Sequence, residues 1–157
     1  MNAIDIYRAF FRAILRQDDA TRVSNDSIDH ALVLIEELIS FSKSTVDIYC
    51  HKLSLDVWGV PAIKKVVRTA HERGVAFRVV VQEKIDADIQ AGAFSFMCNQ
   101  VKQYSNPCMR ANFLIADRRS FRFEGDYTQR RGFAYVRNEN LSGKLVNAFD
   151  AIYQAAG

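Results

Sequence analysis

The chain has 157 residues, of which 49% are hydrophobic and 25% are charged, and its net charge at neutral pH is +3. This balance excludes a generally disordered chain and is enough to build a single domain, residues 1–157, around a sizeable core. No apolar run approaches the length that crosses a membrane. Asp5, Arg8 and Arg12 interrupt the apolar pattern at the start, which argues against a signal peptide.

Along the first half of the chain, apolar residues alternate between helical and strand periods. The elements that they predict are, in order, a helix over residues 4–16, a helix over 28–39, a strand over 46–50, a helix over 61–73 and a strand over 75–81. Asn25, Asp26 and Ser27 are candidate caps for the second helix. Pro61 suits the first turn of the third helix, and Gly74 suits its end. The strand–helix–strand run predicts a parallel pair of strands.

The second half predicts a hairpin and a closing helix. Its elements are, in order, a helix over residues 86–100, a strand over 111–116, a turn over 117–120, strands over 121–123 and 132–136, and a helix over 141–153. Gly92 interrupts the pattern of the first of these. Together the elements predict an α/β fold with a mixed sheet covered by helices. Residues 28–155 would form its core, and residues 1–26 would add an N-terminal helical extension.

The positive charge of the chain is unevenly placed. Residues 1–100 have a net charge of −1 and residues 101–157 a net charge of +4, and seven arginines lie within residues 110–137. A local basic excess indicates a phosphate-bearing or acidic partner, although a solvated surface explains it equally well.

The three cysteines are Cys50, Cys98 and Cys108. Their number is odd and their spacing is not that of a metal site. We therefore expect no disulfide, no metal, no cofactor and a reducing, cytoplasmic environment.

Residues 110–117, Arg-Ala-Asn-Phe-Leu-Ile-Ala-Asp, have the spacing of a known catalytic motif without its chemical groups. They resemble the signature of the phospholipase D-like superfamily, which is a His, any residue, a Lys, any four residues and an Asp. The order of the elements over residues 28–155, the run Ala-His-Glu-Arg-Gly-Val at 70–75 and the final helix resemble that family too. In the family, the His attacks phosphorus and becomes a covalent phosphohistidine, while the Lys stabilises the phosphate oxygens.

The resemblance implies a degenerate, single-half member of the family. Arg110 stands at the position of the His and Asn112 at that of the Lys, so only Asp117 of the motif remains. Arginine stays protonated and cannot act as a nucleophile, and asparagine has no charge. We therefore expect no catalytic residue. His51, at the end of a predicted strand, is the one candidate for a rescued reaction, but a partly buried structural histidine is the preferred interpretation.

Aromatic residues interleave with the arginine-rich segment, a pattern that can indicate single-stranded nucleic-acid binding. The alternation Phe121-Arg122-Phe123 instead favours a strand with one buried and one exposed face. Trp58 lies in a predicted loop, where it would either anchor an interface or pack on its own domain.

Three functional hypotheses remain open. In the first, the chain is a catalytically inactive module that acts as a binding, assembly or accessory subunit, in a nucleic-acid-acting or antiviral defence system. In the second, it binds the phosphate backbone of a nucleic acid through the arginines Arg110, Arg118, Arg119, Arg130 and Arg131. In the third, it is an active, metal-independent phosphodiesterase with displaced catalytic residues.

The expected partners follow from the resemblance and from the N-terminal helix. Single-half members of the family pair as homodimers, and the apolar stripe of residues 7–15 gives this chain a further surface to bury. We expect a homo-oligomer, with a second protein or a nucleic acid as further partners and no membrane.

Overall fold

The computed structural model describes residues 1–83, 92–97, 99–129 and 131–157, which fold around a mixed β-sheet. Within the described residues the sheet has seven strands in the order β1-β7-β6-β5-β2-β3-β4. The strands are β1 (Arg22–Asn25), β2 (Thr45–Cys50), β3 (Ala76–Val81), β4 (Lys102–Gln103), β5 (Asn112–Ala116), β6 (Ser120–Glu124) and β7 (Gly132–Tyr135). β2 is parallel to β3, and β5 and β6 form an antiparallel hairpin. The predicted α/β fold is therefore confirmed.

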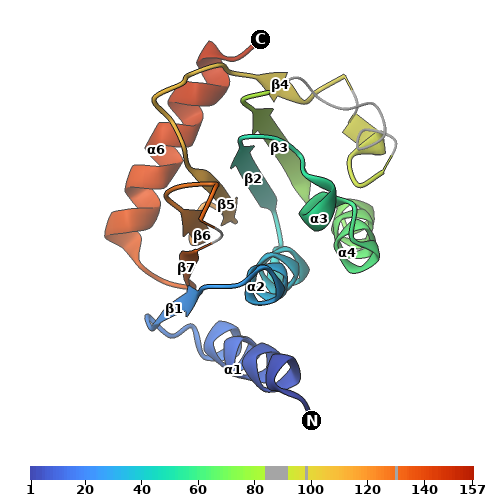
Figure 1. Ribbon diagram of the computed structural model, residues 1–157, viewed down its shortest axis with the longest axis vertical. Coiled ribbons are helices and arrows are strands. Elements are labelled where there is room, and N and C mark those ends of the chain that lie inside the picture. The colour runs from blue at the N-terminus through green and yellow to red at the C-terminus, as the bar shows by residue number, and fades with distance from the viewer. Residues whose placement is uncertain (84–91, 98, 130) are drawn as a thin grey trace.

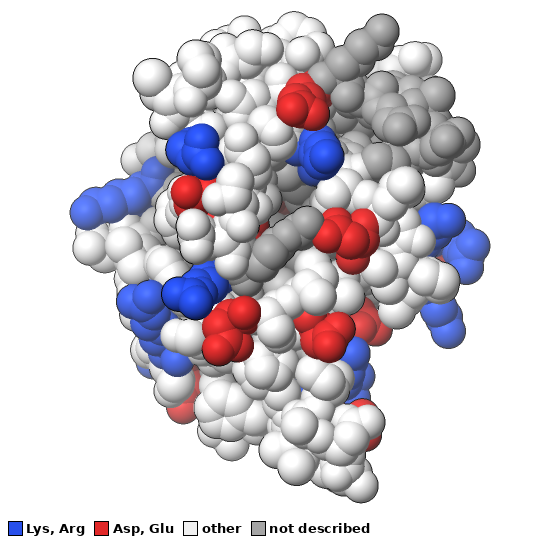
Figure 2. All heavy atoms as spheres, viewed as in Figure 1, with Lys and Arg blue, Asp and Glu red and all other residues white. Residues whose placement is uncertain are grey.

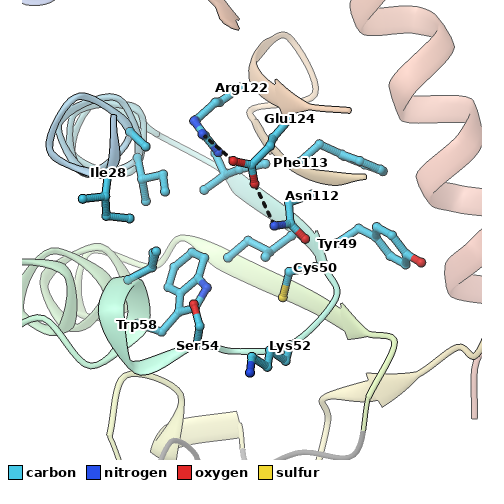
Figure 3. A pocket seen from close by; sticks show the side chains of 15 residues that line it. Ile28, Tyr49, Cys50, Lys52, Ser54, Trp58, Asn112, Phe113, Arg122 and Glu124 are labelled. Atoms are coloured by element: carbon cyan, nitrogen blue, oxygen red, sulfur yellow. Dashed lines mark hydrogen bonds and ion pairs between the residues drawn. The ribbon is translucent and has the colours of Figure 1, made fainter. Parts of the chain in front are cut away.

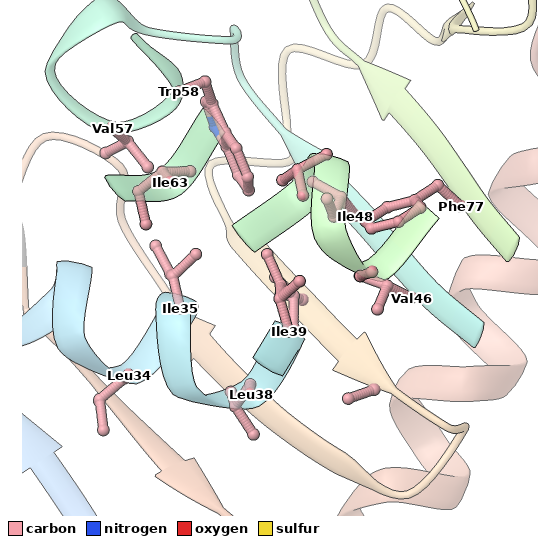
Figure 4. Close-up of a cluster of buried hydrophobic side chains, with 14 of the residues drawn as sticks. Leu34, Ile35, Leu38, Ile39, Val46, Ile48, Val57, Trp58, Ile63 and Phe77 are labelled. Carbon is pink, nitrogen blue, oxygen red and sulfur yellow. The ribbon is translucent and has the colours of Figure 1, made fainter. Parts of the chain in front are cut away.

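Helices cover both faces of this sheet (Figure 1). They are α1 (Ala3–Gln17), α2 (Ile28–Phe41), α3 (Leu55–Trp58), α4 (Pro61–Glu72) and α6 (Glu139–Ala155). The first four share one cluster of buried apolar side chains with one face of the sheet, and α6 covers the other face. Figure 4 shows Ile35 and Ile39 of α2 and Ile63 of α4 lying over Val46 and Ile48 of β2. None of the described helices is long and apolar enough to span a membrane.

The ends of the helices follow the signals in the sequence. Ser27 caps α2, because its side-chain oxygen accepts a hydrogen bond of 3.2 Å from the backbone N–H of His30. Pro61 is the first residue of α4. Gly74 follows that helix with a φ of 94°, a backbone conformation that residues with a Cβ rarely adopt.

Helix α1 is attached to α2 by apolar contacts and by an ion cluster around a buried carboxylate. Phe11 and Ile14 of α1 are buried in the shared core. Glu37 of α2, of which 2% is exposed, is contacted by the guanidinium of Arg8 at 2.7 Å and by that of Arg12 at 3.0 Å. The apolar face predicted for this helix is therefore largely covered within the chain itself.

Two parts of the sheet differ from the sequence prediction because the strands are short. Residues 22–25, which we assigned to an appended extension, form β1 at one edge of the sheet and pair with β7. The hydroxyl of Tyr7 on α1 donates a hydrogen bond of 3.1 Å to the carbonyl oxygen of Ser24, so α1 helps to cover this edge. The two-residue strand β4 was not predicted either. β1 contains a single apolar residue, Val23, and β4 contains none, so neither shows an apolar period.

Two side chains are more deeply buried than their sequence context indicated. Arg122 was expected on an exposed face, but only 5% of it is accessible, because helices cover both sides of the sheet. Trp58 lies in α3 and packs against Phe94 with ring centroids 5.3 Å apart, so it is not a free interface anchor. The α-helix expected over residues 86–100 is wrong for residues 92–97 and 99–100, which form turns and a 3-10 helix at Ser95–Met97, while residues 86–91 and 98 lie outside the described residues.

Candidate functional site

Two of the three motif positions, Arg110 and Asn112, lie at the boundary of the sheet where β2, β3 and β6 end and β5 begins, which we call the motif edge. His51 follows β2, Glu83 follows β3, Arg110 precedes β5, and Tyr127 follows β6. The backbone N–H of Tyr127 donates a hydrogen bond of 2.8 Å to the carbonyl oxygen of Arg110, which joins two of these segments. His51 and Arg110 are far apart in the sequence, and the fold brings both to the motif edge.

Arg110 holds its guanidinium over the ring of Tyr127 and beside a carboxylate. Its Cζ lies 5.1 Å from the ring centroid, and its Nη2 lies 3.3 Å from Oδ1 of Asp126. Half of the Arg110 side chain is exposed, so the planar guanidinium group can still be reached from solvent. Hydrogen bonds from the N–H and hydroxyl of Thr128, and then the contact with Arg110, lower the pKa of Asp126. The charge of Arg110 is therefore partly neutralised by an anionic neighbour.

Asn112 is turned into the sheet, where it connects neighbouring strands. Its side-chain oxygen accepts a hydrogen bond of 2.8 Å from the backbone N–H of His51, and its amide donates one of 2.9 Å to Glu124. Glu124 is buried and lies 3.5 Å from Arg122, whose guanidinium donates in turn to Asn25 on β1 at 3.2 Å. Position 112 therefore contacts a carboxylate of the protein's own chain, in place of the phosphate that the family's Lys would contact.

This polar network lines a small cavity between α2, α3 and the sheet (Figure 3). Asn112, Glu124 and Arg122 lie on one side of it and Trp58 on the other, with Cys50 between them. Its volume is about 50 Å³, room for a few water molecules and far less than a ligand pocket of roughly 300 Å³ or more. Burial raises the pKa of the Cys50 thiol to about 12, so this sulfur is not a reactive thiolate.

His51 is enclosed by hydrogen-bonding and stacking partners. Its Nε2 lies 2.9 Å from Oε1 of Glu83, and its Nδ1 lies 3.4 Å from Oε1 of Gln82. The Gln82 amide donates to the carbonyl of Asn106, which leaves the Gln82 oxygen facing the imidazole. The ring of Tyr127 stacks on the imidazole with centroids 3.9 Å apart. Both ring nitrogens therefore lie within 3.4 Å of a side-chain oxygen of the protein, and Tyr127 covers one face of the ring.

Asp117, the retained motif residue, lies at the other end of these strands, where β5 ends and β2 begins. It organises the loop that enters β2. Its carboxylate accepts hydrogen bonds from the backbone N–H groups of Lys43 at 3.0 Å, Ser44 at 2.7 Å and Thr45 at 3.1 Å. Burial opposes ionisation of Asp117, but these hydrogen bonds together outweigh it and lower its pKa. The φ of Asp117 is 55°, a conformation that Asp and Asn tolerate better than most residues. Its contacts are those of a structural residue.

The predicted arginine cluster does not form a single surface. Arg118 and Arg119 follow β5, whereas Arg110 precedes it, so the length of a five-residue strand separates them. Arg118 pairs with Asp150 at 2.7 Å, and Arg119 pairs with Asp18 at 2.6 Å. Arg131 lies at the same edge as Arg110 but two strands away, just before β7. Arg130 lies outside the described residues.

Acidic and basic side chains are interspersed on the face that Figure 2 shows, without a continuous basic area. Two of the acidic residues at the candidate site, Glu83 and Asp126, contact its histidine and its arginine directly. In the described part of the chain, no three His, Cys, Asp or Glu side chains gather in a way that could hold a metal ion.

Comparisons with known proteins identify the fold. No protein-family model matches the chain, and no curated protein matches it in sequence. Among solved structures it is similar to Nuc from Salmonella typhimurium, a phospholipase D family member, with a TM-score of 0.61 and 14% identity over 87% of this chain and 95% of Nuc. The fold is phospholipase D-like.

A second similar structure is that of TrmBL2, an archaeal chromatin protein with a novel mode of DNA binding. The TM-score is 0.64 and the identity 10%, over 97% of this chain and 61% of TrmBL2. This chain therefore spans less than two thirds of TrmBL2. At such low identities the likeness to both proteins shows a shared fold alone.

Sequence reasoning missed three residues of the site: Tyr127, Glu83 and Gln82. Glu83 and Gln82 directly follow the buried strand β3, so the rule that sites form at the carboxyl ends of strands could have found them. Tyr127 is one of the aromatic residues that interleave with the arginine-rich segment, and no local signal separates it from the others.

Proposed function

We propose that this chain is a non-catalytic module of phospholipase D-like fold that acts by binding, as an assembly or accessory subunit. The observation that carries the proposal is the state of the two motif positions. Arg110 is a permanently protonated side chain paired with Asp126, and Asn112 is bound to Glu124 within the sheet. Neither side chain can attack phosphorus, and a buried carboxylate contacts the side chain that stands where the family's Lys would stabilise phosphate oxygens.

A rescued reaction through His51 has little support from the geometry. A nucleophilic imidazole needs one unprotonated nitrogen aimed at the substrate. In His51, Nε2 is directed at Glu83 and Nδ1 at Gln82, while Tyr127 covers the ring. The partners are those expected of a structural histidine.

The proposal predicts that the purified protein has no metal-independent phosphodiesterase activity. With EDTA present, we expect no release of p-nitrophenol from bis(p-nitrophenyl) phosphate and no cleavage of DNA or RNA above the level of heat-denatured protein. EDTA suppresses contaminating nucleases that need a metal. Turnover that survives EDTA and is lost in His51→Ala would contradict the proposal.

The biological setting that we propose is a nucleic-acid-acting assembly, antiviral defence included, in which the chain associates with itself and with a protein partner. Its support is the motif without catalytic groups, together with the likeness in fold to a DNA-binding chromatin protein. A stoichiometric protein that co-purifies with the chain would support the accessory role, whereas co-purifying nucleic acid would favour backbone binding.

Backbone binding is the second candidate function, and the exposure of Arg110 favours it. The Arg110 side chain is half exposed, and its guanidinium lies over the ring of Tyr127. It has the planar fork of donors that matches phosphate oxygens. Asp126 opposes this role because it competes for the same donors. Among the other predicted arginines that the structure describes, only Arg131 lies at the same edge, so a site made of these residues would neutralise few phosphates and bind weakly.

Three substitutions test this second function by fluorescence anisotropy with a labelled oligonucleotide at low salt. Arg110→Ala should weaken binding by about tenfold, the loss expected for one charged hydrogen-bonding group. Asp126→Asn should strengthen binding, since it removes the competing anion. Arg68→Ala, an exposed arginine on α4, is the matched control and should leave binding unchanged. An affinity that is the same in Arg110→Ala and in the unmodified protein would exclude the site.

A further inference from the structure

The outer face of α1 carries an apolar stripe that the rest of the described chain does not cover. Ile6 and Phe10 are 57% and 51% exposed, and Ala3, Ala9 and Ala13 lie on the same side of the helix. This stripe is distinct from the inner face, where Phe11 and Ile14 enter the core. Figures 1 and 2 place α1 at one end of the molecule, where the surface is mostly uncharged.

The spacing of the stripe is that of a helix–helix seam. Ala3, Ile6, Phe10 and Ala13 are separated by three, four and three residues, the alternation of the a and d positions of a heptad. In an antiparallel pair of identical helices, each a position meets a d position. Ile6 of one copy would then pack against Phe10 of the other, and Ala3 against Ala13, which gives two large inner layers between two small outer ones.

The charges beside the stripe distinguish the two possible orientations. Asp5 lies near the start of α1 and Arg12 and Arg16 near its end, and all three are exposed. These three residues lie on one flank of the stripe. In a parallel pair that flank would face the opposite flank of the partner helix, which carries Tyr7 and Ile14, whereas an antiparallel pair brings Asp5 of one copy within about a turn of Arg12 and Arg16 of the other. The helix dipoles are also opposed in that arrangement. The face is therefore complementary to itself only when the two helices run in opposite directions.

We propose that the outer face of α1 binds the same face of a second copy of this chain, antiparallel and about a twofold axis. This inference rests on the self-association proposed above and names its surface. The buried carboxylate of Glu37 pairs with Arg8 and with the exposed Arg12, and this ion cluster holds α1 in place, so the face is presented without a change of conformation. A pair of 15-residue helices forms an interface below the roughly 1,200–2,000 Å² of stable complexes, so the dimer is reversible and concentration-dependent.

Sedimentation velocity over a concentration series tests the surface. Ile6→Gln combined with Phe10→Gln should raise the dissociation constant of the dimer by roughly a hundredfold, because four large apolar side chains leave the interface. Leu55→Gln, an equally exposed leucine on α3, is the matched control and should leave it unchanged. Both variants alter exposed side chains, and circular dichroism verifies that they fold.

Disulfide trapping tests the orientation, in a chain whose Cys98 and Cys108 are replaced by serine. Ala3 and Ala13 are about 15 Å apart along the helix, too far for a cysteine at either position to reach its own counterpart in an antiparallel pair. Ala3→Cys and Ala13→Cys proteins should therefore crosslink when mixed and not when separate.

The outcomes distinguish the proposed self-association from the proposed α1 surface. Crosslinking of each cysteine variant with itself would overturn the antiparallel arrangement. A dimer that persists in Ile6→Gln combined with Phe10→Gln would overturn the α1 surface while self-association stands. A monomer at every concentration would overturn both, and would leave the proposed lack of catalysis untouched.

Discussion

Removal of both cations from the buried carboxylate of Glu37 should destabilise the protein by about 3–5 kcal/mol, because an ionised group would remain buried without a partner. Glu37 is 2% exposed, and Arg8 and Arg12 are its cationic neighbours at 2.7 and 3.0 Å. The double variant Arg8→Ala with Arg12→Ala should therefore show a large loss in the free energy of unfolding, measured by urea denaturation.

Removing the arginines and removing Glu37 should have unequal costs, because only Glu37 is buried, and this difference makes the prediction specific. Glu37→Leu should cost much less, since both arginines can turn to water while the apolar contacts of Phe11 and Ile14 persist. Adding Glu37→Leu to the double arginine variant should recover most of the lost stability. Arg16→Ala, an exposed position on the last turn of α1, should change stability by less than about 0.5 kcal/mol. Equal costs for the double variant and for Glu37→Leu would show that the buried charge is not the cause.

Asp117→Ala should cost about 2–4 kcal/mol, from two effects that add. It leaves the N–H groups of Lys43, Ser44 and Thr45 without their acceptor, and it places a Cβ-bearing residue with no local hydrogen bond at a φ of 55°. Asp117→Asn retains one oxygen acceptor and tolerates this φ, so it should cost about 1 kcal/mol. Urea denaturation at neutral pH measures both variants.

The same residue predicts a dependence of stability on pH. Its pKa in the folded protein is lowered, so its contribution is present above the unfolded pKa of about 4 and is lost as the pH falls through the folded value. Asp117→Asn should flatten the fall in stability over that acidic range. If the unfolding free energy of this variant follows that of the unmodified protein at every pH, the carboxylate does not hold the loop as the hydrogen bonds indicate.

The parts of the fold that the sequence predicted are those with long periodic segments. β2, α4 and β3 were predicted because six-residue strands and a twelve-residue helix show their period clearly. β1 and β4 were missed because they contain one apolar residue and none, and because tertiary pairing alone makes them strands. The burial of Arg122 was missed because alternation along a strand cannot show that helices cover both faces of the sheet.

The sequence predicted which residues belong to the candidate site, but it predicted few of the contacts that these residues make. The spacing of residues 110–117 located Arg110, Asn112 and Asp117, but it could not show that Asn112 binds Glu124 or that Tyr127 covers His51. Those contacts join strands whose order the sequence does not specify. The sequence could not establish whether Arg110, Arg118 and Arg119 share one surface, and the structure places Arg110 at the opposite end of β5 from the other two.

The central claim is that no side chain at the motif edge forms a covalent intermediate with phosphorus, and intact-mass spectrometry tests it most directly. The protein is incubated with bis(p-nitrophenyl) phosphate and EDTA, then quenched in alkaline denaturant, because phosphohistidine hydrolyses in acid. Since Arg110 cannot attack phosphorus and both nitrogens of His51 are engaged, we predict an unchanged mass. A mass increased by one phosphoryl ester, mapped to His51 and absent in His51→Ala, would contradict the account.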